Sequence, residues 1–173
     1  MSRPVQSLLS SEVLHNPDCL FQGGSERILI VEDEAPFREA LQELLEATGF
    51  QSYALESVEE ALSYLRHSSC HLILSDIRLP GLDGFDLLRH VADCCPETAV
   101  IMITGICDTQ VAVNCLSAGA YDYITKPFLA TDLATKIVNA LDRRRLMAAR
   151  HHHHSEPRGT SPGAESSYPA SAR

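Results

Sequence analysis

The sequence predicts an α/β fold, a parallel sheet with helices on both of its faces. Short apolar segments alternate five times with segments of helical periodicity between residues 26 and 147. Parallel neighbouring strands need a long crossover connection, which a helix supplies, so this alternation favours parallel pairing. The most apolar segment, Ala99 to Ile103 (AVIMI), is typical of a strand that is covered on both faces.

Each predicted strand is a short apolar run that stops at a polar residue or a turn signal. The five strands are expected at Arg27 to Val31, Phe50 to Leu55, Leu72 to Ser75, Ala99 to Ile103, and Tyr121 to Thr125. Apolar residues at helical spacing follow every strand. These helical stripes lie within Phe37 to Leu45, Ala61 to Leu65, Phe85 to Val91, Val111 to Leu116, and Leu133 to Leu141.

Boundary signals flank three of the predicted helices. Pro36 suits the first turn of the first helix, which Gly49 ends. Ser57 and Glu60 form a capping-box pattern ahead of the second helix. Thr131 is expected to cap the fifth helix. The local signals therefore agree with the alternation of strands and helices.

The composition divides the chain into three parts. Residues 1–25 end in Gly-Gly-Ser and show no sustained period, which predicts a flexible N-terminal arm. Residues 148–173 are rich in Ser, Pro, Gly and Ala and offer too few apolar side chains to form a core, which predicts a disordered tail that includes the His151 to His154 run. Residues 26–147 are the expected folded domain. Whether this domain is complete or belongs to a longer protein is left open.

The charge distribution argues against a nucleic-acid partner. Residues 26–146 contain nineteen acidic and ten basic residues, and this excess of nine accounts for the whole formal charge of −9. The only basic cluster, Arg143 to Arg145, is interpreted as a solvated helix C-terminus rather than a phosphate contact. No apolar run is long enough to cross a bilayer, so no membrane association and a cytoplasmic location are expected.

Polar residues stand at the carboxyl ends of four predicted strands. They are Glu32 and Asp33, Asp76, Thr104, and Lys126. Because ligands of open parallel sheets bind beyond the carboxyl ends of the strands, these side chains are expected to converge. Three close carboxylates repel one another unless a cation lies among them. The oxygen-only ligand set favours Mg²⁺, for which Mn²⁺ can substitute.

This combination of residues is suited to phosphoryl transfer. With the metal ion shielding its charge, Asp76 can act as a nucleophile toward phosphorus. Lys126 would counter the charge on the phosphoryl oxygens, and Thr104 would donate a hydrogen bond to one of them. The sequence therefore predicts that Asp76 accepts a phosphoryl group.

Four motifs, ILIVEDE, LILSDIRLPGLDG, VIMITG and GAYDYITKPF, resemble the receiver domains of bacterial two-component response regulators, including chemotaxis receivers. The resemblance covers about Glu26 to Leu146. It implies a flavodoxin-like (βα)5 doubly wound parallel sheet with the strand order 2-1-3-4-5. It also implies that the phosphoryl group comes from the phosphohistidine of a sensor histidine kinase or a phosphotransfer protein.

The resemblance assigns roles to the residues at the metal site. Asp76 is the implied phosphoacceptor, and Glu32 and Asp33 form the acidic pocket. The backbone carbonyl of Arg78 would complete the protein ligands of Mg²⁺. Lys126 matches the lysine that the family uses at the phosphoryl group.

Further roles concern switching and the lifetime of the phosphoryl group. Thr104 is the implied switch hydroxyl, and Tyr123 is the aromatic residue that turns inward when this hydroxyl moves. The Lys126-Pro127 bond is a candidate cis peptide on the same resemblance. Arg78 and Ile106 would flank the path of attacking water, and their size and apolarity are expected to slow hydrolysis.

Three alternatives follow from these expectations. The domain is expected to be a signalling receiver that catalyses only its own phosphorylation and dephosphorylation. A hydrolase with an aspartyl-phosphate intermediate would need a second Asp two residues after the nucleophile, where Arg78 stands. A pseudo-receiver would need a damaged pocket.

The expected output surface comprises helix four, strand five and helix five, which would bind a downstream protein target; homodimer formation through it is left open.

Overall fold

The computed structural model describes residues 26–105 and 109–153, which form five strands and five helices in strict alternation. The elements are β1 (Arg27–Val31), α1 (Ala35–Ala47), β2 (Gln51–Leu55), α2 (Val58–Leu65), β3 (Leu72–Asp76), α3 (Gly84–Cys94), β4 (Ala99–Thr104), α4 (Thr109–Ser117), β5 (Asp122–Thr125) and α5 (Ala130–His153).

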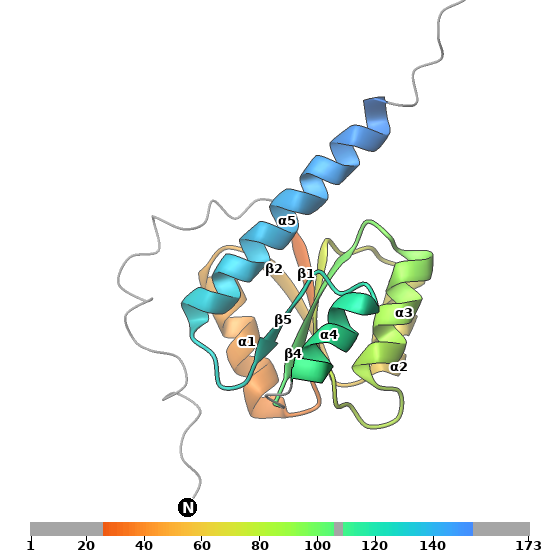
Figure 1. Ribbon diagram of the computed structural model, residues 1–173. Coiled ribbons are helices and arrows are strands. Elements are labelled where there is room, and N and C mark those ends of the chain that lie inside the picture. The colour runs from red at the N-terminus through yellow and green to blue at the C-terminus, as the bar shows by residue number, and fades with distance from the viewer. Residues whose placement is uncertain (1–25, 106–108, 154–173) are drawn as a thin grey trace, which may run out of the picture.

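All five strands belong to one parallel sheet with the order β2-β1-β3-β4-β5. Figure 1 shows the helices arranged on both sides of this sheet. The predicted α/β class, the parallel pairing and the flavodoxin-like strand order are confirmed. Among the residues that the structure describes, no helix is both long enough and apolar enough to span a membrane.

The core consists of two apolar layers, one on each face of the sheet. Alternate strand residues point to opposite faces, so Ile28 and Ile30 of β1 face α1 and α5, whereas Leu29 and Val31 face α2, α3 and α4. β3 and β4 are buried on both faces because they occupy the centre of the sheet with β1. The rigid centre of the sheet therefore carries the strand ends at which the candidate site lies.

Turn and cap residues place the helices over the sheet. Gly49 adopts a φ of 83° directly after α1, a conformation that a glycine accepts without a Cβ penalty. The Ser57 hydroxyl accepts a hydrogen bond from the Glu60 amide at 3.3 Å, as the capping-box pattern predicts. At the start of α3, Asp83 and Asp86 form a complete capping box, in addition to the predicted boundary signals.

Several element boundaries differ from the expected ones. Asp76 and Thr104 were expected to follow their strands, but they are the last residues of β3 and β4 because their backbones still pair with Ile103 and Thr125. Thr131 lies inside the first turn of α5, which begins at Ala130, so its expected capping role is wrong. Helix α5 continues to His153, and the expected domain boundary at residue 147 lies within this helix.

Candidate functional site

The register of the sheet brings the polar strand ends to one edge. Parallel pairing aligns Val31 with Ser75 and Asp76 with Ile103, so the ends of β1, β3 and β4 lie side by side. Glu32 continues directly from β1, and its amide donates to the Leu55 carbonyl at 3.0 Å. The candidate site is therefore built on backbone that the central strands hold in place.

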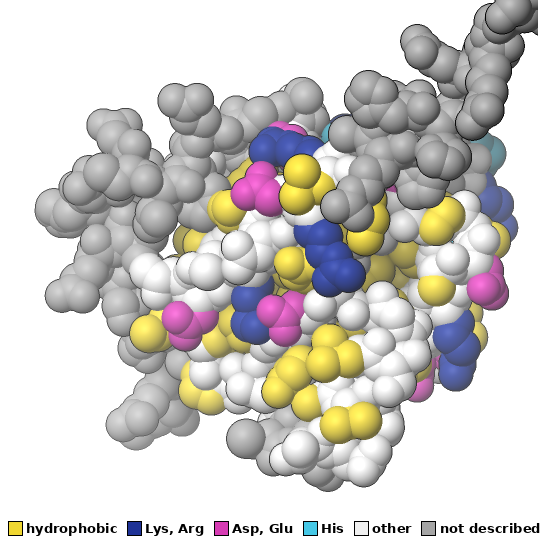
Figure 2. Space-filling model, turned by 45° about the horizontal axis from the view of Figure 1, so that its top comes forward, with side chains coloured by type: hydrophobic (Ala, Val, Ile, Leu, Met, Phe, Trp, Pro, Cys, Tyr) yellow, Lys and Arg dark blue, Asp and Glu magenta, His cyan; other side chains and the backbone are white. Residues whose placement is uncertain are grey.

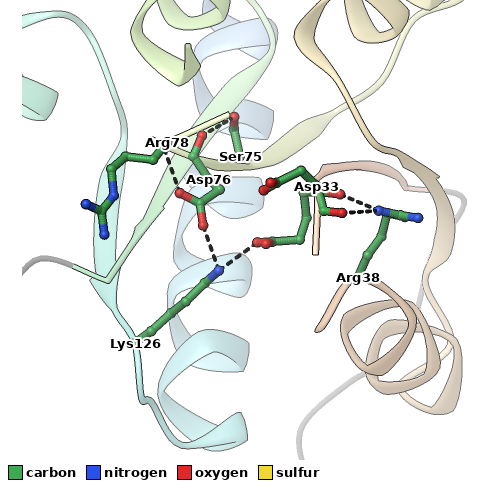
Figure 3. Close-up of polar contacts among 7 residues, drawn as sticks. Asp33, Arg38, Ser75, Asp76, Arg78 and Lys126 are labelled. Carbon is green, nitrogen blue, oxygen red and sulfur yellow. Dashed lines mark hydrogen bonds and ion pairs between the residues drawn. The ribbon is translucent and has the colours of Figure 1, made fainter. Parts of the chain in front are cut away.

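Lys126 connects two of the predicted carboxylates. Its Nζ donates to Asp76 Oδ2 at 2.6 Å and to Glu32 Oε2 at 2.8 Å (Figure 3). The Lys126 amide also donates to the Thr104 carbonyl at 2.7 Å, which ties the end of β5 to the end of β4. The structure thus brings Glu32, Asp76 and Lys126 into direct contact, as expected from their positions after or at the strand ends.

The two carboxylates differ from ordinary surface acids because both are almost removed from water. Glu32 is 1% exposed and Asp76 is 8% exposed. Burial raises the pKa of Glu32 to about 7. The negative charge of Asp76 also raises this pKa, whereas the hydrogen bond and the positive charge of Lys126 lower it without cancelling the effect of burial. Burial alone would lower the pKa of Lys126, but its hydrogen bonds to Asp76 and Glu32 and their charges outweigh this effect and raise it. Lys126 is therefore held as an ammonium ion.

The second oxygen of Asp76 is also fixed by the protein. Asp76 Oδ1 accepts a hydrogen bond from the Arg78 amide at 2.7 Å. The Arg78 side chain is exposed and extends away from Asp76 (Figure 3). Its guanidinium lies close to Gly105, where a Cβ built on the glycine would be 3.8 Å from Nη2. The two residues thus border the same side of the site.

Asp33 and Glu32 sit in a loop that Arg38 holds. Arg38 Nη1 donates to the Glu32 carbonyl at 2.7 Å and to the Asp33 carbonyl at 3.1 Å. The Asp33 carboxylate is exposed and turns away from Arg38 toward Asp76 (Figure 3). Sequence reasoning missed Arg38, because only the fold shows that the first turns of α1 lie against this loop.

The predicted switch residues belong to β4 and β5. Thr104 is 2% exposed at the end of β4, and Tyr123 is half-buried in β5. Tyr123 packs against the apolar layer formed with α2, α3 and α4, and Lys136 Nζ lies 5.9 Å from the centre of its ring. Ile106 lies outside the described residues. The Lys126-Pro127 bond is cis, as the motif resemblance implied.

The donor chemistry of the site matches a hard cation. Across residues 26–105 and 109–153, no three acidic, His or Cys side chains form a ready-made ion cage. Mg²⁺ does not require such a cage, because it commonly binds through one or two carboxylates, phosphate oxygens and retained waters. The carboxylates of Asp33, which is exposed, and of Asp76 are oxygen ligands of this kind.

The fold and the site together define a flavodoxin-like α/β protein with an acidic site beyond the carboxyl ends of its strands. The response regulator receiver domain model matches residues 28–138. The chain therefore belongs to the family of response regulator receiver domains, which are signalling domains of two-component systems.

Sequence relatives include longer transcriptional regulators. The chain is 37% identical over 120 residues to the C4-dicarboxylate transport transcriptional regulatory protein DctD of Rhizobium meliloti, covering 69% of this chain and 26% of that protein. It is 38% identical over 124 residues to the phosphate regulon transcriptional regulatory protein PhoB of Escherichia coli, covering 70% of this chain and 54% of that protein. The chain thus spans about a quarter to about half the length of these relatives.

Solved structures show the same fold. A response regulator receiver domain protein from Clostridium thermocellum superimposes with a TM-score of 0.67 at 32% identity, covering 70% of this chain and 98% of that one. NtrX from Brucella abortus superimposes with a TM-score of 0.71 at 31% identity, covering 76% of this chain and 30% of that one. The resemblance drawn from the four sequence motifs is confirmed.

Proposed function

We propose that Asp76 is the phosphoacceptor of this receiver domain and takes its phosphoryl group from the phosphohistidine of a sensor histidine kinase or a phosphotransfer protein in the cytoplasm. The observation that carries this proposal is the 2.6 Å contact between the Lys126 ammonium and Asp76 Oδ2 at the carboxyl end of a central strand. This contact supports the proposal because a positive charge there would offset the negative charge that gathers during phosphoryl transfer.

In the proposed reaction, a carboxylate oxygen of Asp76 forms a bond to phosphorus while the phosphorus–nitrogen bond of the donor breaks. The electron pair leaves on the histidine nitrogen, which takes up a proton. Lys126 balances the negative charge of the phosphoryl oxygens, and the Thr104 hydroxyl donates to one of them. The domain catalyses only this transfer and the later hydrolysis of its own acyl phosphate.

Glu32, Asp33, Asp76 and the Arg78 carbonyl would hold Mg²⁺, for which Mn²⁺ can substitute. When bound, the metal ion supplies positive charge that lowers repulsion between Asp76 and the incoming phosphoryl group. The protein contributes by fixing the carboxylates: Lys126 holds Glu32 and Asp76, and Arg38 holds the loop of Glu32 and Asp33.

We propose that Arg78 and Ile106 prolong the lifetime of the phosphoryl group by slowing its hydrolysis. The proposal is supported by the position of the Arg78 guanidinium, which lies beside Gly105 at the border of the site. The side chain extends away from Asp76 in the unphosphorylated protein, so this role requires that it turn toward the phosphoryl group, where its bulk would hinder water from reaching phosphorus in line with the bond to Asp76. In an Arg78→Asn variant the phosphorylated form should therefore decay faster, and an unchanged decay rate would exclude this role.

We assign the output to a face formed by α4, β5 and α5, which would bind a downstream protein target. Hydrophobic side chains lie open on the molecular surface (Figure 2), and α4 contributes Val113 and Leu116, each 49% exposed. Thr104 ends β4 beside β5, and Tyr123 belongs to β5 of this face. A movement of Thr104 toward the phosphoryl group would free space for Tyr123 and change this surface in a two-state manner.

Intact mass spectrometry tests the proposed function. The chain is incubated with Mg²⁺ and a small phosphodonor such as acetyl phosphate or phosphoramidate, and its mass is compared before and after. Wild type should gain one phosphoryl group, and Asp76→Asn should gain none. Asp93→Asn, which alters an exposed acid of α3, is the matched control and should behave like wild type. Equal phosphorylation of Asp76→Asn and wild type would refute the proposal.

A further inference from the structure

An aromatic ring forms a third contact of the Lys126 ammonium. Lys126 Nζ lies 4.0 Å from the centre of the Phe37 ring, in addition to its hydrogen bonds to Glu32 and Asp76. This distance is well inside the range of about 6 Å in which the negative face of an aromatic ring attracts a cation. Phe37 belongs to the first turn of α1 and is none of the predicted site residues.

The ring of Phe37 is fixed on more than one side. The Phe128 ring meets it edge to face, with the ring centres 5.8 Å apart and an angle of 77° between their planes. Phe128 lies two residues after Lys126, beyond the cis bond to Pro127. Phe37 also packs on the apolar layer between the sheet and α5, and its amide donates to the Glu34 carbonyl at 3.1 Å. The ring therefore presents its face to Lys126 in a fixed position.

We propose that Phe37 is a positioning residue for the phosphoryl transfer at Asp76, acting through a cation–π contact with Lys126. This inference rests on the proposed function. The carboxylate of Asp76 becomes part of an acyl phosphate when the reaction proceeds, so its hydrogen bond to Lys126 must rearrange. The Phe37 ring takes no part in that chemistry, and its attraction for the ammonium persists throughout. It keeps the positive charge beside phosphorus while the carboxylate partner changes.

Apolar packing alone would also explain a phenylalanine at this place. The two explanations differ in what they require of the ring. Packing of α1 against the segment after β5 requires only its size and shape. The cation–π contact requires the negative charge of its face, which ring fluorination removes stepwise with little change in size. A fluorinated series at position 37 therefore separates the two.

The main experiment measures the phosphorylation rate of full chains that carry phenylalanine, 4-fluorophenylalanine or 3,4,5-trifluorophenylalanine at position 37. The donor is acetyl phosphate at a fixed Mg²⁺ concentration. We expect the rate to fall with each step of fluorination, by about two- to tenfold over the series. The same series at Phe85, a half-buried ring of α3 on the other face of the sheet, should leave the rate unchanged.

A second measurement examines the contact in the unphosphorylated protein. The chain has two lysines, Lys126 and Lys136, so lysine-selective ¹³C labelling yields two sets of ε-methylene signals. Those of Lys126 should lie upfield, because the group stands over a ring face, and Phe37→Leu should abolish this shift. Lys136 lies 5.9 Å from the centre of the Tyr123 ring, and its signals should stay in place in Phe37→Leu, so they are the reference for an unchanged lysine.

A flat fluorination series at Phe37, or Lys126 signals that do not move in Phe37→Leu, would overturn the inference while leaving the proposed function in place. If the wild-type chain takes up no phosphoryl group at Asp76, both fail together. A graded loss of rate at Phe37 alone supports the positioning role.

Discussion

Lys126 Nζ lies 2.6 Å from Asp76 Oδ2 although fifty positions separate the two residues in the sequence. The contact results from the parallel sheet, in which β3 ends at Asp76 and β5 ends one residue before Lys126, with β4 between them. It pairs a largely buried carboxylate with an ammonium ion that also forms an ion pair with Glu32. Glu32 and Asp76, two buried acids that would otherwise repel each other, thereby share one positive charge.

Replacement of Lys126 should affect the chemistry more than the fold. In Lys126→Met, the positive charge beside the phosphoryl oxygens is lost, and the phosphorylation rate should fall by about a hundredfold or more. The variant also leaves Glu32 and Asp76 facing each other, which should cost on the order of 1–3 kcal/mol of unfolding free energy. Rates with a small phosphodonor and urea unfolding curves measure the two effects. Lys136→Met, which changes the only other lysine, is the matched control and should retain the rate.

Gly84 should be irreplaceable because it allows α3 to begin against the backbone of Asp76. A Cβ at this position would lie 2.3 Å from the Asp76 carbonyl oxygen and 2.8 Å from Met102 Cε. The carbonyl belongs to a central strand and cannot move aside. Gly84→Ala should therefore cost about 3 kcal/mol or more and lower phosphorylation. Gly105→Ala is the control: its Cβ would meet only Arg78 Nη2 at 3.8 Å, so stability should change little. Equal stability of the two variants would contradict this interpretation.

The loop between Asp76 and α3 contains a turn whose backbone conformation at Gly81 would be strained for any residue with a Cβ. Gly81 has a φ of 82°, and a Cβ there would lie 2.7 Å from Glu59 Oε1, which accepts a hydrogen bond from the Leu82 amide at 3.2 Å. The Glu59 carboxylate is the end of a flexible side chain and can shift, so the backbone strain should dominate. We expect Gly81→Ala to cost about 1 kcal/mol in both the wild-type and the Glu59→Ala backgrounds. A cost that disappears in the Glu59→Ala background would instead identify the steric contact as the cause.

The end of the sheet opposite the site carries a pH-dependent ion pair. Arg145 forms a hydrogen bond and an ion pair with Glu26, which lowers the pKa of Glu26 below its ordinary value of 4.5. A lowered carboxyl pKa contributes stability above the unfolded value, and this contribution is lost as the pH falls through the folded value. Glu26→Gln should thus be less stable than wild type at pH 7, by less than about 1 kcal/mol, and the difference should shrink below pH 4.5. Glu39→Gln, at an exposed position of α1, should show no such convergence.

The change from apolar to polar residues predicted where the strands of the site end to within one residue. The apolar runs of β1 and β5 stop directly before a charged residue or one position earlier, so Glu32 and Lys126 could be located from hydropathy although Glu32 is buried in the fold. The ends of β3 and β4 were placed one residue early, because backbone pairing continues through Asp76 and Thr104 after the apolar run has ended. Side-chain polarity does not report on that pairing.

The residues that support the site were not predictable in the same way. Phe37 is one apolar residue of a predicted helical stripe, and nothing in the sequence singles out Arg38. Their contacts with Lys126 and with the loop after β1 depend on how the first turns of α1 lie over the strand ends. That arrangement is set by tertiary packing. A local pattern in the sequence carries no signal for it.

The identity of the phosphorylated side chain is the most direct test. The chain is phosphorylated with acetyl phosphate and Mg²⁺ and reduced with borohydride, which converts an aspartyl phosphate to homoserine, and its peptides are then sequenced by mass spectrometry. The account predicts homoserine at position 76, dependent on the phosphodonor. Homoserine at Asp33 or another acid, with Asp76 unchanged in a phosphorylated protein, would contradict it.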